Sequence, residues 1–277
     1  MIINSWQELL DSNTSQKPVA IGGFPRGGTT FAYRCLSGFV KQSWHLEEYF
    51  HQFYEFTVNE HEQIVIDKPA IDRKLTRGQK INKNKDADWY SEIERRYHML
   101  RDQHSWHSAF IKVLPFHAKD LNTANPAYYR DLMHSHWWLM ILRRDYINMT
   151  LSNLYSNHFN RFHYYGDQPL PRQPFIGCIS DLNPIYKGQW LWLKKMWEDS
   201  NGCGRFVMAE DITHLKEGPS PFIVKSPRVD RDKPQLFKEV FLNYDELVEA
   251  IQKSCQEVER ETDGFFTFTD TQVKVNT

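Results

Sequence analysis

Residues 22–31 combine the side chains and the backbone freedom that phosphate binding needs. The stretch follows a short apolar run and reads Gly-Gly-Phe-Pro-Arg-Gly-Gly-Thr-Thr-Phe. Glycines allow consecutive backbone N–H groups to converge on an anion, and a helix that begins at Gly28 adds the positive end of its dipole. Arg26 supplies a guanidinium, and Thr29 and Thr30 supply hydroxyl donors. The sequence therefore predicts an anion-binding turn.

The glycine spacing of this turn argues against ATP as the ligand. Gly23 and Gly28 are spaced as in the loop that binds nucleoside triphosphates. In that loop a lysine and then a serine or threonine follow the second glycine, whereas Thr29 and Thr30 stand here. The cationic side chain of this turn is instead Arg26, which precedes the second glycine.

A second turn rich in cations follows the apolar run at residues 137–142. Arg143 and Arg144 come directly after this run, and Ser152 lies eight positions after Arg144. In an open α/β sheet, an arginine at a strand end and a serine on the next helix can hold one phosphate from two sides. The alternative role for such an arginine is to pair with a surface acid.

Residues 24–31 resemble the 5′-phosphosulfate loop of the sulfotransferases that use 3′-phosphoadenosine 5′-phosphosulfate (PAPS). That loop usually reads Pro-Lys/Arg-Ser-Gly-Thr-Thr-Trp, and this chain departs from it with Gly27 for Ser and Phe31 for Trp. The first departure removes a hydroxyl donor, and the second keeps an aromatic ring. The resemblance implies that the 5′-phosphosulfate is held by Arg26, Gly27, Gly28, Thr29, Thr30 and Phe31.

Residues 137–152 are similar to the same family's 3′-phosphate element, an apolar strand followed by Arg-Asn/Asp-Pro and a later Ser. Arg144 and Ser152 stand at the matching positions, with Tyr146 in place of the usual Pro or Ala. The two elements occur in the family's order along the chain. The resemblance therefore implies that Arg144 and Ser152 hold the 3′-phosphate.

The resemblance covers about residues 19–212 and implies a fold, an activity and a donor. The fold is the sulfotransferase variant of the P-loop nucleotide-hydrolase-like α/β fold. The activity is in-line transfer of a sulfuryl group from PAPS to a hydroxyl or amine of a small-molecule or glycan acceptor, without a metal, leaving the product PAP. Lys112 matches the family's catalytic lysine, and Arg26 would offset charge on the bridging oxygen. The loop that many members fold over the nucleotide has a weak counterpart at residues 225–228.

Four residues are candidates for the general base that takes the acceptor proton. His117 lies a few residues after Lys112, and a histidine titrates near neutral pH. Asp67 ends a stretch that resembles the Glu-Lys-Ser-Pro pattern of members with a carboxylate base. Glu47 and Glu48 follow the first helix, and a carboxylate can serve when burial favours its protonated form. The sequence does not choose among them.

Two other functions stay open beside sulfotransfer. A small-molecule kinase gains support from Asp67, which ends an apolar run as a metal-binding Asp would, and loses support through the absent P-loop lysine. A non-catalytic module of the same fold would bind a nucleotide or a sulfated ligand. This alternative rests on His117, which is displaced from the family's position, and on the missing C-terminal loop.

Short apolar runs alternate with helical patterns, which predicts an open, mostly parallel, doubly wound α/β sheet flanked by helices. The expected strands are residues 19–21, 63–66, 110–114, 137–142 and 205–209. The expected helices are residues 28–39, 147–155, 186–197 and 244–263. Asn243 is the expected N-cap of the last helix, and Gly264 its stop. Residues 1–277 are expected to form one domain, with a C-terminal loop, helix and tail over residues 213–277.

The amino-acid composition indicates which binding partners and which cellular compartment to expect. The 277 residues carry 34 Lys and Arg against 35 Asp and Glu, a formal net charge of −1. Proteins that bind nucleic acid over their surface carry a basic excess, so no nucleic-acid partner is expected. The longest apolar run is far shorter than the roughly 20 residues of a membrane span, and no signal peptide is expected. Scattered cysteines predict reduced thiols in a cytoplasmic protein, and no metal site is expected.

Overall fold

The computed structural model describes residues 3–42, 44–46, 50, 55–58, 64–67, 83–103, 109–159, 170–215 and 233–277. The strands are β1 (Val19–Gly23), β2 (Trp44–Leu46), β3 (Glu55–Val58), β4 (Ile64–Asp67), β5 (Ala109–Lys112), β6 (Trp137–Leu142), β7 (Gly204–Met208), β8 (Phe266–Phe268) and β9 (Val273–Val275). The α-helices are α1 (Trp6–Asp11), α2 (Thr29–Leu36), α3 (Lys83–His98), α4 (Pro115–Ala124), α5 (Pro126–Ser135), α6 (Tyr146–His158), α7 (Gly188–Asp199), α8 (Lys233–Val240) and α9 (Tyr244–Glu261). Short 3-10 or π turns are η1 (Met99–Gln103), η3 (Ile179–Asp181), η4 (Leu182–Lys187) and η5 (Ala209–Asp211).

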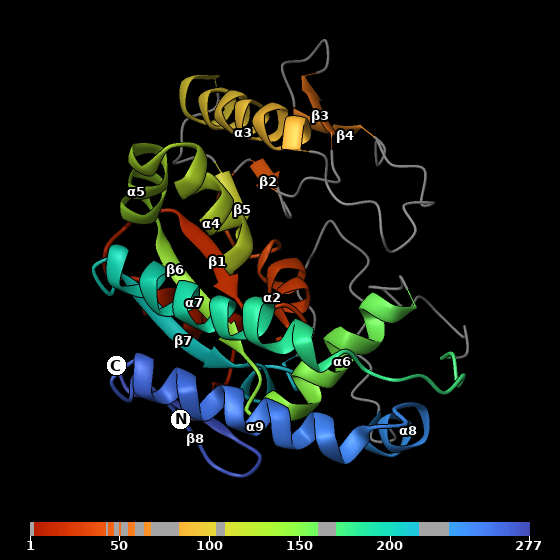
Figure 1. The fold of residues 1–277 in the computed structure, drawn as a ribbon. Helices are drawn as coiled ribbons and strands as arrows, with labels where there is room; N and C mark the ends of the chain where they lie inside the picture. The colour runs from red at the N-terminus through yellow and green to blue at the C-terminus, as the bar shows by residue number, and fades with distance from the viewer. Residues whose placement is uncertain are drawn as a thin grey trace.

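A five-stranded sheet forms the centre of the molecule, with the strand order β2-β5-β1-β6-β7 (Figure 1). Every neighbouring pair in this sheet is parallel. All residues of β1, β5 and β6 are buried, as expected of parallel strands that are covered on both faces. The prediction of an open, parallel α/β sheet flanked by helices is confirmed.

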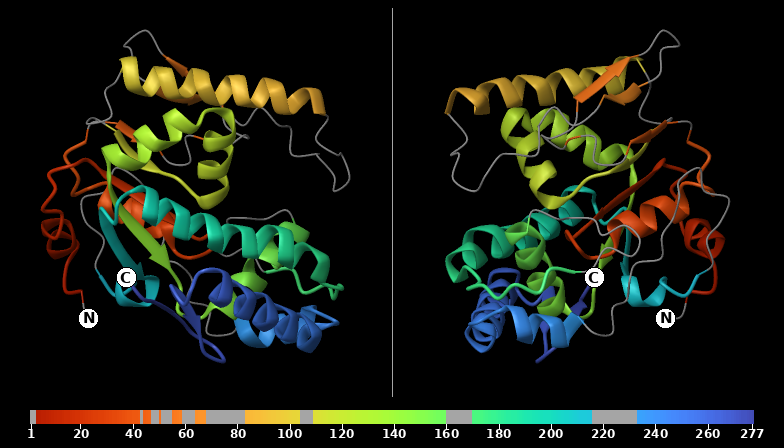
Figure 2. Two further views of the ribbon diagram at one scale, coloured as in Figure 1. Left: turned by 60° about the vertical axis from the view of Figure 1, so that its left-hand side comes forward. Right: turned by 90° about the vertical axis from the view of Figure 1, so that its right-hand side faces the viewer.

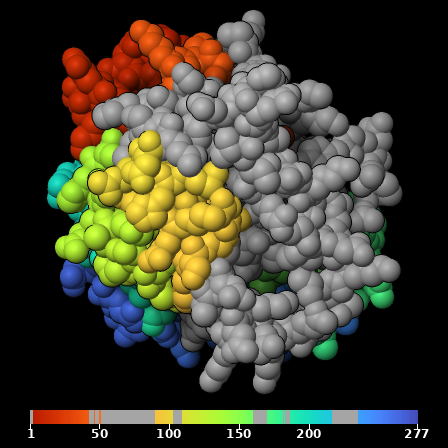
Figure 3. Space-filling view, turned by 90° about the horizontal axis from the view of Figure 1, so that it is seen from above, coloured from red at the N-terminus to blue at the C-terminus, as the bar shows by residue number. Residues whose placement is uncertain are grey.

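Side chains of alternate strand residues divide between two apolar cores. On β6, Trp137, Leu139 and Ile141 join the core that includes α1 and α2. Trp138 and Met140 point the other way, into the larger core that includes α4, α7 and α9. The sheet therefore lies between two helical layers (Figure 2). Seen from above, the described part of α3 adjoins the α4–α5 segment (Figure 3), in keeping with the packing of α3 on α4.

One expected strand is not part of this sheet. β4 pairs antiparallel with β3, and the two form a separate hairpin in which Asp67 lies opposite Glu55. The prediction that residues 63–66 join the parallel strands is wrong. β3 lies only a few positions before β4 in the chain, and closing the short loop between them costs less conformational entropy than pairing with a distant strand. The edge position is taken by β2, whose three residues were too short a run to be recognised.

The helices agree with the periodic pattern, but the start of α9 differs from expectation. α9 buries Leu247, Ile251, Cys255 and Val258 on one face, and Gly264 follows it with a φ of 72°. Asn243 does not cap α9 with its side chain, because its amide instead bonds the backbone N–H and C=O of residue 177. Among the described residues, no helix has the length and apolar character needed to cross a membrane.

Candidate functional site

The turn after β1 has the left-handed backbone that an anion nest requires. The N–H of Gly27 donates to the carbonyl of Phe24 at 2.9 Å, which closes a tight turn with Pro25 at its second position. The third residue, Arg26, has a φ of 63°, and Gly28 has a φ of 94°. A positive φ at the third position is typical of a type II turn, where glycine is usual. A strained arginine here is the kind of feature that collects at functional sites.

Close packing against β6 and β7 explains the glycines of this turn. A Cβ on Gly23 would lie 2.1 Å from the carbonyl oxygen of Ile141, and the φ of Gly23 is 134°. A Cβ on Gly28 would lie 2.9 Å from the Cβ of Ala209, the first residue of η5. The turn therefore sits directly on the carboxyl ends of β6 and β7.

The carboxyl ends of the neighbouring strands β1 and β5 form a topological switch point of the sheet. β1 leads into α2, whose Ala32 packs in one core, and β5 leads into α4, whose Ala118 packs in the other. Adjacent strands whose helices cover opposite faces leave a crevice at their carboxyl ends, where ligands bind in open α/β folds. The glycine turn and Lys112 stand on the two sides of this position.

Arg26 reaches the second predicted phosphate element. Its Nε donates a hydrogen bond to the Oγ of Ser152 at 3.3 Å, across 126 positions of sequence. Ser152 lies on the second turn of α6 and is buried. The structure thus brings together two residues that were assigned to separate phosphate groups.

Lys112 joins the same group of side chains from β5. It is the last residue of β5, lies beside Ile21 in register, and is fully buried. Its Nζ donates to the Oγ1 of Thr30 at 2.9 Å, in the first turn of α2. A buried ammonium needs hydrogen-bond acceptors, because removing a charged group from water costs far more free energy than removing a neutral polar group. The contact places a cation at the glycine turn.

Arg144 is paired with an acid rather than with Ser152. Its Nη2 donates to both carboxylate oxygens of Asp211 at 2.7 Å, and its backbone N–H donates to Glu210 at 3.1 Å. The guanidinium of Arg143 lies 3.9 Å from Glu210. The two acids belong to η5, the turn after β7 that touches Gly28. The sequence analysis did not identify these two acids as partners of the arginines. The available signal was that both acids directly follow the last predicted strand, so they lie at the same edge of the sheet as Arg143 and Arg144.

Two predicted site residues have structural contacts instead. Phe31 is 8% exposed, and its ring packs on Trp6 with centroids 6.0 Å apart, inside the core below α2. His117 is buried in the first turn of α4, where its Nδ1 accepts a hydrogen bond from the backbone N–H of Leu114. The geometry thus gives Phe31 a packing role and His117 a capping role.

The carboxylate candidates for the base do not join the group at the glycine turn. Asp67 ends β4 of the separate hairpin, so it does not stand at the carboxyl edge of the parallel sheet. Glu47 and Glu48 lie outside the described residues, as do residues 225–228. Among the described residues, no three His, Cys, Asp or Glu side chains are grouped closely enough to hold a metal ion.

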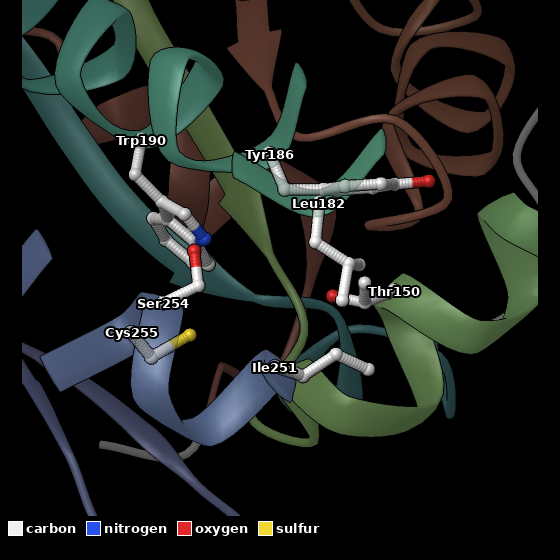
Figure 4. A pocket seen from close by; sticks show the side chains of 7 residues that line it. All are labelled: Thr150, Leu182, Tyr186, Trp190, Ile251, Ser254 and Cys255. Atoms are coloured by element: carbon white, nitrogen blue, oxygen red, sulfur yellow. The ribbon is translucent and has the colours of Figure 1, made fainter. Parts of the chain in front are cut away.

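A small pocket lies between α6, η4, α7 and α9, and its lining does not include the glycine turn (Figure 4). It is lined by Thr150, Leu182, Tyr186, Trp190, Ile251, Ser254 and Cys255. The hydroxyl of Tyr186 points away from Cys255, and the Tyr186 ring stacks on Phe24 with centroids 6.5 Å apart. Burial raises the pKa of the Cys255 thiol, so the thiol is neutral at physiological pH. Its interior has space for about one water molecule, too little for a substrate.

Comparison with protein-family models, with curated proteins and with solved structures found no match to this chain. The candidate site is therefore defined by its own geometry. It consists of Arg26, Gly27, Gly28, Thr29, Thr30, Lys112, Arg144 and Ser152 at the carboxyl edge of the parallel sheet, with Glu210 and Asp211 beside them.

Proposed function

We propose that this chain is a PAPS-dependent sulfotransferase. The observation that supports the proposal most strongly is the hydrogen bond between Arg26 and Ser152. The two residues were drawn from motifs 126 positions apart, on the expectation that both bind one nucleotide, and they are in contact. A chance resemblance in either motif would not require this contact.

The side chains at the turn suit the binding of a phosphosulfate. Backbone N–H groups at the start of α2 point out of the helix end, and Thr29 and Thr30 add hydroxyl donors. Arg26 and Lys112 bring two positive charges to the same turn. Fixed donors and cations of this kind bind an anion without a metal ion.

In the proposed reaction, the sulfur–oxygen bond to the phosphate breaks while a bond from the acceptor oxygen or nitrogen to the sulfur forms, and the general base takes the proton that the acceptor loses. PAPS supplies the sulfuryl group, and the phosphate leaves with the electron pair of the broken bond. Arg26 and Lys112 stabilise the negative charge that grows on the phosphate oxygen. The backbone of the glycine turn holds the donor in line with the acceptor.

Thermal unfolding with added nucleotides tests the proposal. PAP without Mg²⁺ should raise the melting temperature, because a ligand at a hundredfold excess over its Kd adds about 2.7 kcal/mol to the free energy of unfolding. ATP with Mg²⁺ should not. Stabilisation by ATP and Mg²⁺ alone would favour a kinase, and PAP binding without turnover over a wide panel of alcohols, phenols and amines would favour a binding module.

The role of Arg144 has its own test. Arg144→Ala should weaken PAP much more than adenosine 5′-phosphosulfate, which lacks the 3′-phosphate. Equal weakening of both ligands would reject the assignment.

The general base is found by comparing the pH–rate profiles of four variants: His117→Ala, Asp67→Asn, Glu47→Gln and Glu48→Gln. Only loss of the base removes the acidic limb of the profile.

A further inference from the structure

We propose that Asp211 acts as an internal substitute for the nucleotide's 3′-phosphate and competes with it for the guanidinium of Arg144. The inference rests on the proposed function, because it concerns the same site. It assigns Asp211 as a residue that sets the affinity for nucleotides carrying a second phosphate.

The pairing geometry is that of an arginine holding an anion. Nη2 of Arg144 lies 2.7 Å from both Oδ1 and Oδ2 of Asp211. An arginine binds carboxylate and phosphate through the same kind of short, charge-assisted hydrogen bonds. The guanidinium is thus already placed to receive an anion, and a carboxylate of the chain occupies that place.

The backbone of Arg144 is fixed while its side chain can exchange partners. The N–H of Arg144 is held by Glu210, and its carbonyl accepts from the N–H of Val273 at 2.9 Å. The side chains of Arg144 and Asp211 are 38% and 22% exposed, so water reaches both. Exchange of Asp211 for a phosphate therefore needs a change of side-chain rotamers and no change of fold.

The pair stands beside the glycine turn. Asp211 ends η5, and the first residue of η5, Ala209, is the residue that a Cβ on Gly28 would touch. The Arg144–Asp211 pair is therefore near any nucleotide whose 5′ end occupies the glycine turn. Binding through Arg144 must displace Asp211, and the energy of the lost pair is subtracted from the affinity for the 3′-phosphate.

Removing the competing charge should tighten binding of PAP selectively. Asp211→Asn keeps the size of the side chain and removes its charge. We expect Kd for PAP to fall by about two- to fivefold, the upper part of the range for a partly exposed ion pair, with Kd for adenosine 5′-monophosphate changed less than about twofold. Both Kd values are measured by calorimetry on the full chain without Mg²⁺, and Asp211→Ser provides a second variant should the first be poorly folded.

Glu198→Gln is the matched control for net charge. It removes one carboxylate from a partly exposed ion pair with Lys194. Glu198 lies near the end of α7, which leads into β7, so it lies at the amino ends of the strands, whereas the candidate site lies at their carboxyl ends. This control should leave both Kd values unchanged. The double variant Asp211→Asn with Arg144→Ala should bind PAP no better than Arg144→Ala alone, because the competition needs the guanidinium.

The outcomes separate the inference from the function. If the unaltered chain binds PAP and Asp211→Asn binds it equally or more weakly, Asp211 positions Arg144 or is neutral, and the competition is rejected while the sulfotransferase proposal stands. A similar gain for adenosine 5′-monophosphate or for Glu198→Gln would also reject it. If neither the chain nor either Asp211 variant binds PAP, the proposed function fails, and the competition fails with it.

Discussion

The Nε of Arg26 lies 3.3 Å from the Oγ of Ser152, and this hydrogen bond joins the glycine turn to α6. Arg26 reaches it from a backbone with a φ of 63°, which an arginine adopts at a cost of about 1–3 kcal/mol. The turn and α6 follow the neighbouring strands β1 and β6, so their contact depends on the parallel order of the sheet.

Arg26→Ala should weaken PAP by about tenfold or more, since hydrogen bonds to a charged partner contribute about 1.5–3 kcal/mol. Ser152→Ala should weaken it less. If the two act together, a double-mutant cycle will show a coupling of at least about 0.5 kcal/mol. Calorimetric titration of PAP into the two single variants and the double variant measures this.

Ser156→Ala is the control for that cycle. Ser156 is one turn further along α6, and its hydroxyl donates to the backbone carbonyl of Ser152 rather than to Arg26. Its replacement should leave PAP binding unchanged. Full additivity of Arg26→Ala and Ser152→Ala would contradict the shared role.

Thr30→Val should lower the free energy of unfolding by about 1–2 kcal/mol, because it removes an acceptor from the buried ammonium of Lys112. Thr30→Ser keeps the hydroxyl and should restore most of the stability. Thr123→Val is the control, since Thr123 bonds an exposed backbone carbonyl on α4, and its effect should stay within about 0.5 kcal/mol. Urea unfolding measures all three, and equal losses in the valine and serine variants would contradict the prediction.

Gly23→Ala should destabilise the fold by at least about 3 kcal/mol. Its φ is 134°, and a Cβ would lie 2.1 Å from the carbonyl oxygen of Ile141, so the backbone of β6 would have to move. Gly188→Ala is the matched control, because a Cβ there meets nothing within 4 Å at the start of α7. That change should be neutral or stabilising by up to about 1 kcal/mol. A stable Gly23→Ala variant would show that the turn does not rest on β6.

The buried thiol of Cys255 should make stability fall in alkaline solution. Burial raises its pKa in the folded chain, whereas the thiol of the unfolded chain ionises from about pH 9.0. Above that pH the unfolded state releases a proton that the folded state keeps, so stability falls by about 1.4 kcal/mol per pH unit. The contribution is complete below pH 9 and declines as the pH rises.

Cys255→Ser should flatten this decline between pH 9 and pH 10.5. Cys178→Ser, at a half-buried cysteine, is the control and should leave the slope unchanged. Denaturant unfolding at several pH values measures the slope. An equal slope in the unaltered chain and in Cys255→Ser would show that the thiol ionises normally in the folded protein.

Much of the site could be predicted from local sequence because its causes are local. Apolar runs in the sequence predict strands at residues 19–21, 110–114 and 137–142, and the structure has buried strands there as β1, β5 and β6. Strands buried on both faces are typically parallel in α/β folds. The glycines and threonines around Arg26 predict a turn that leads into a helix, and the structure has both. The Gly264 stop of α9 is equally local, since left-handed backbone favours glycine.

Tertiary structure decided which of these local features meet. The strand order places β6 beside β1 and β7, and this order brings Ser152 to Arg26 and Asp211 to Arg144. A guanidinium binds a carboxylate as readily as a phosphate, so no spacing along the chain could say which anion Arg144 would hold. The pairing of β4 with β3 was decided in the same way, because an apolar run does not encode its partner.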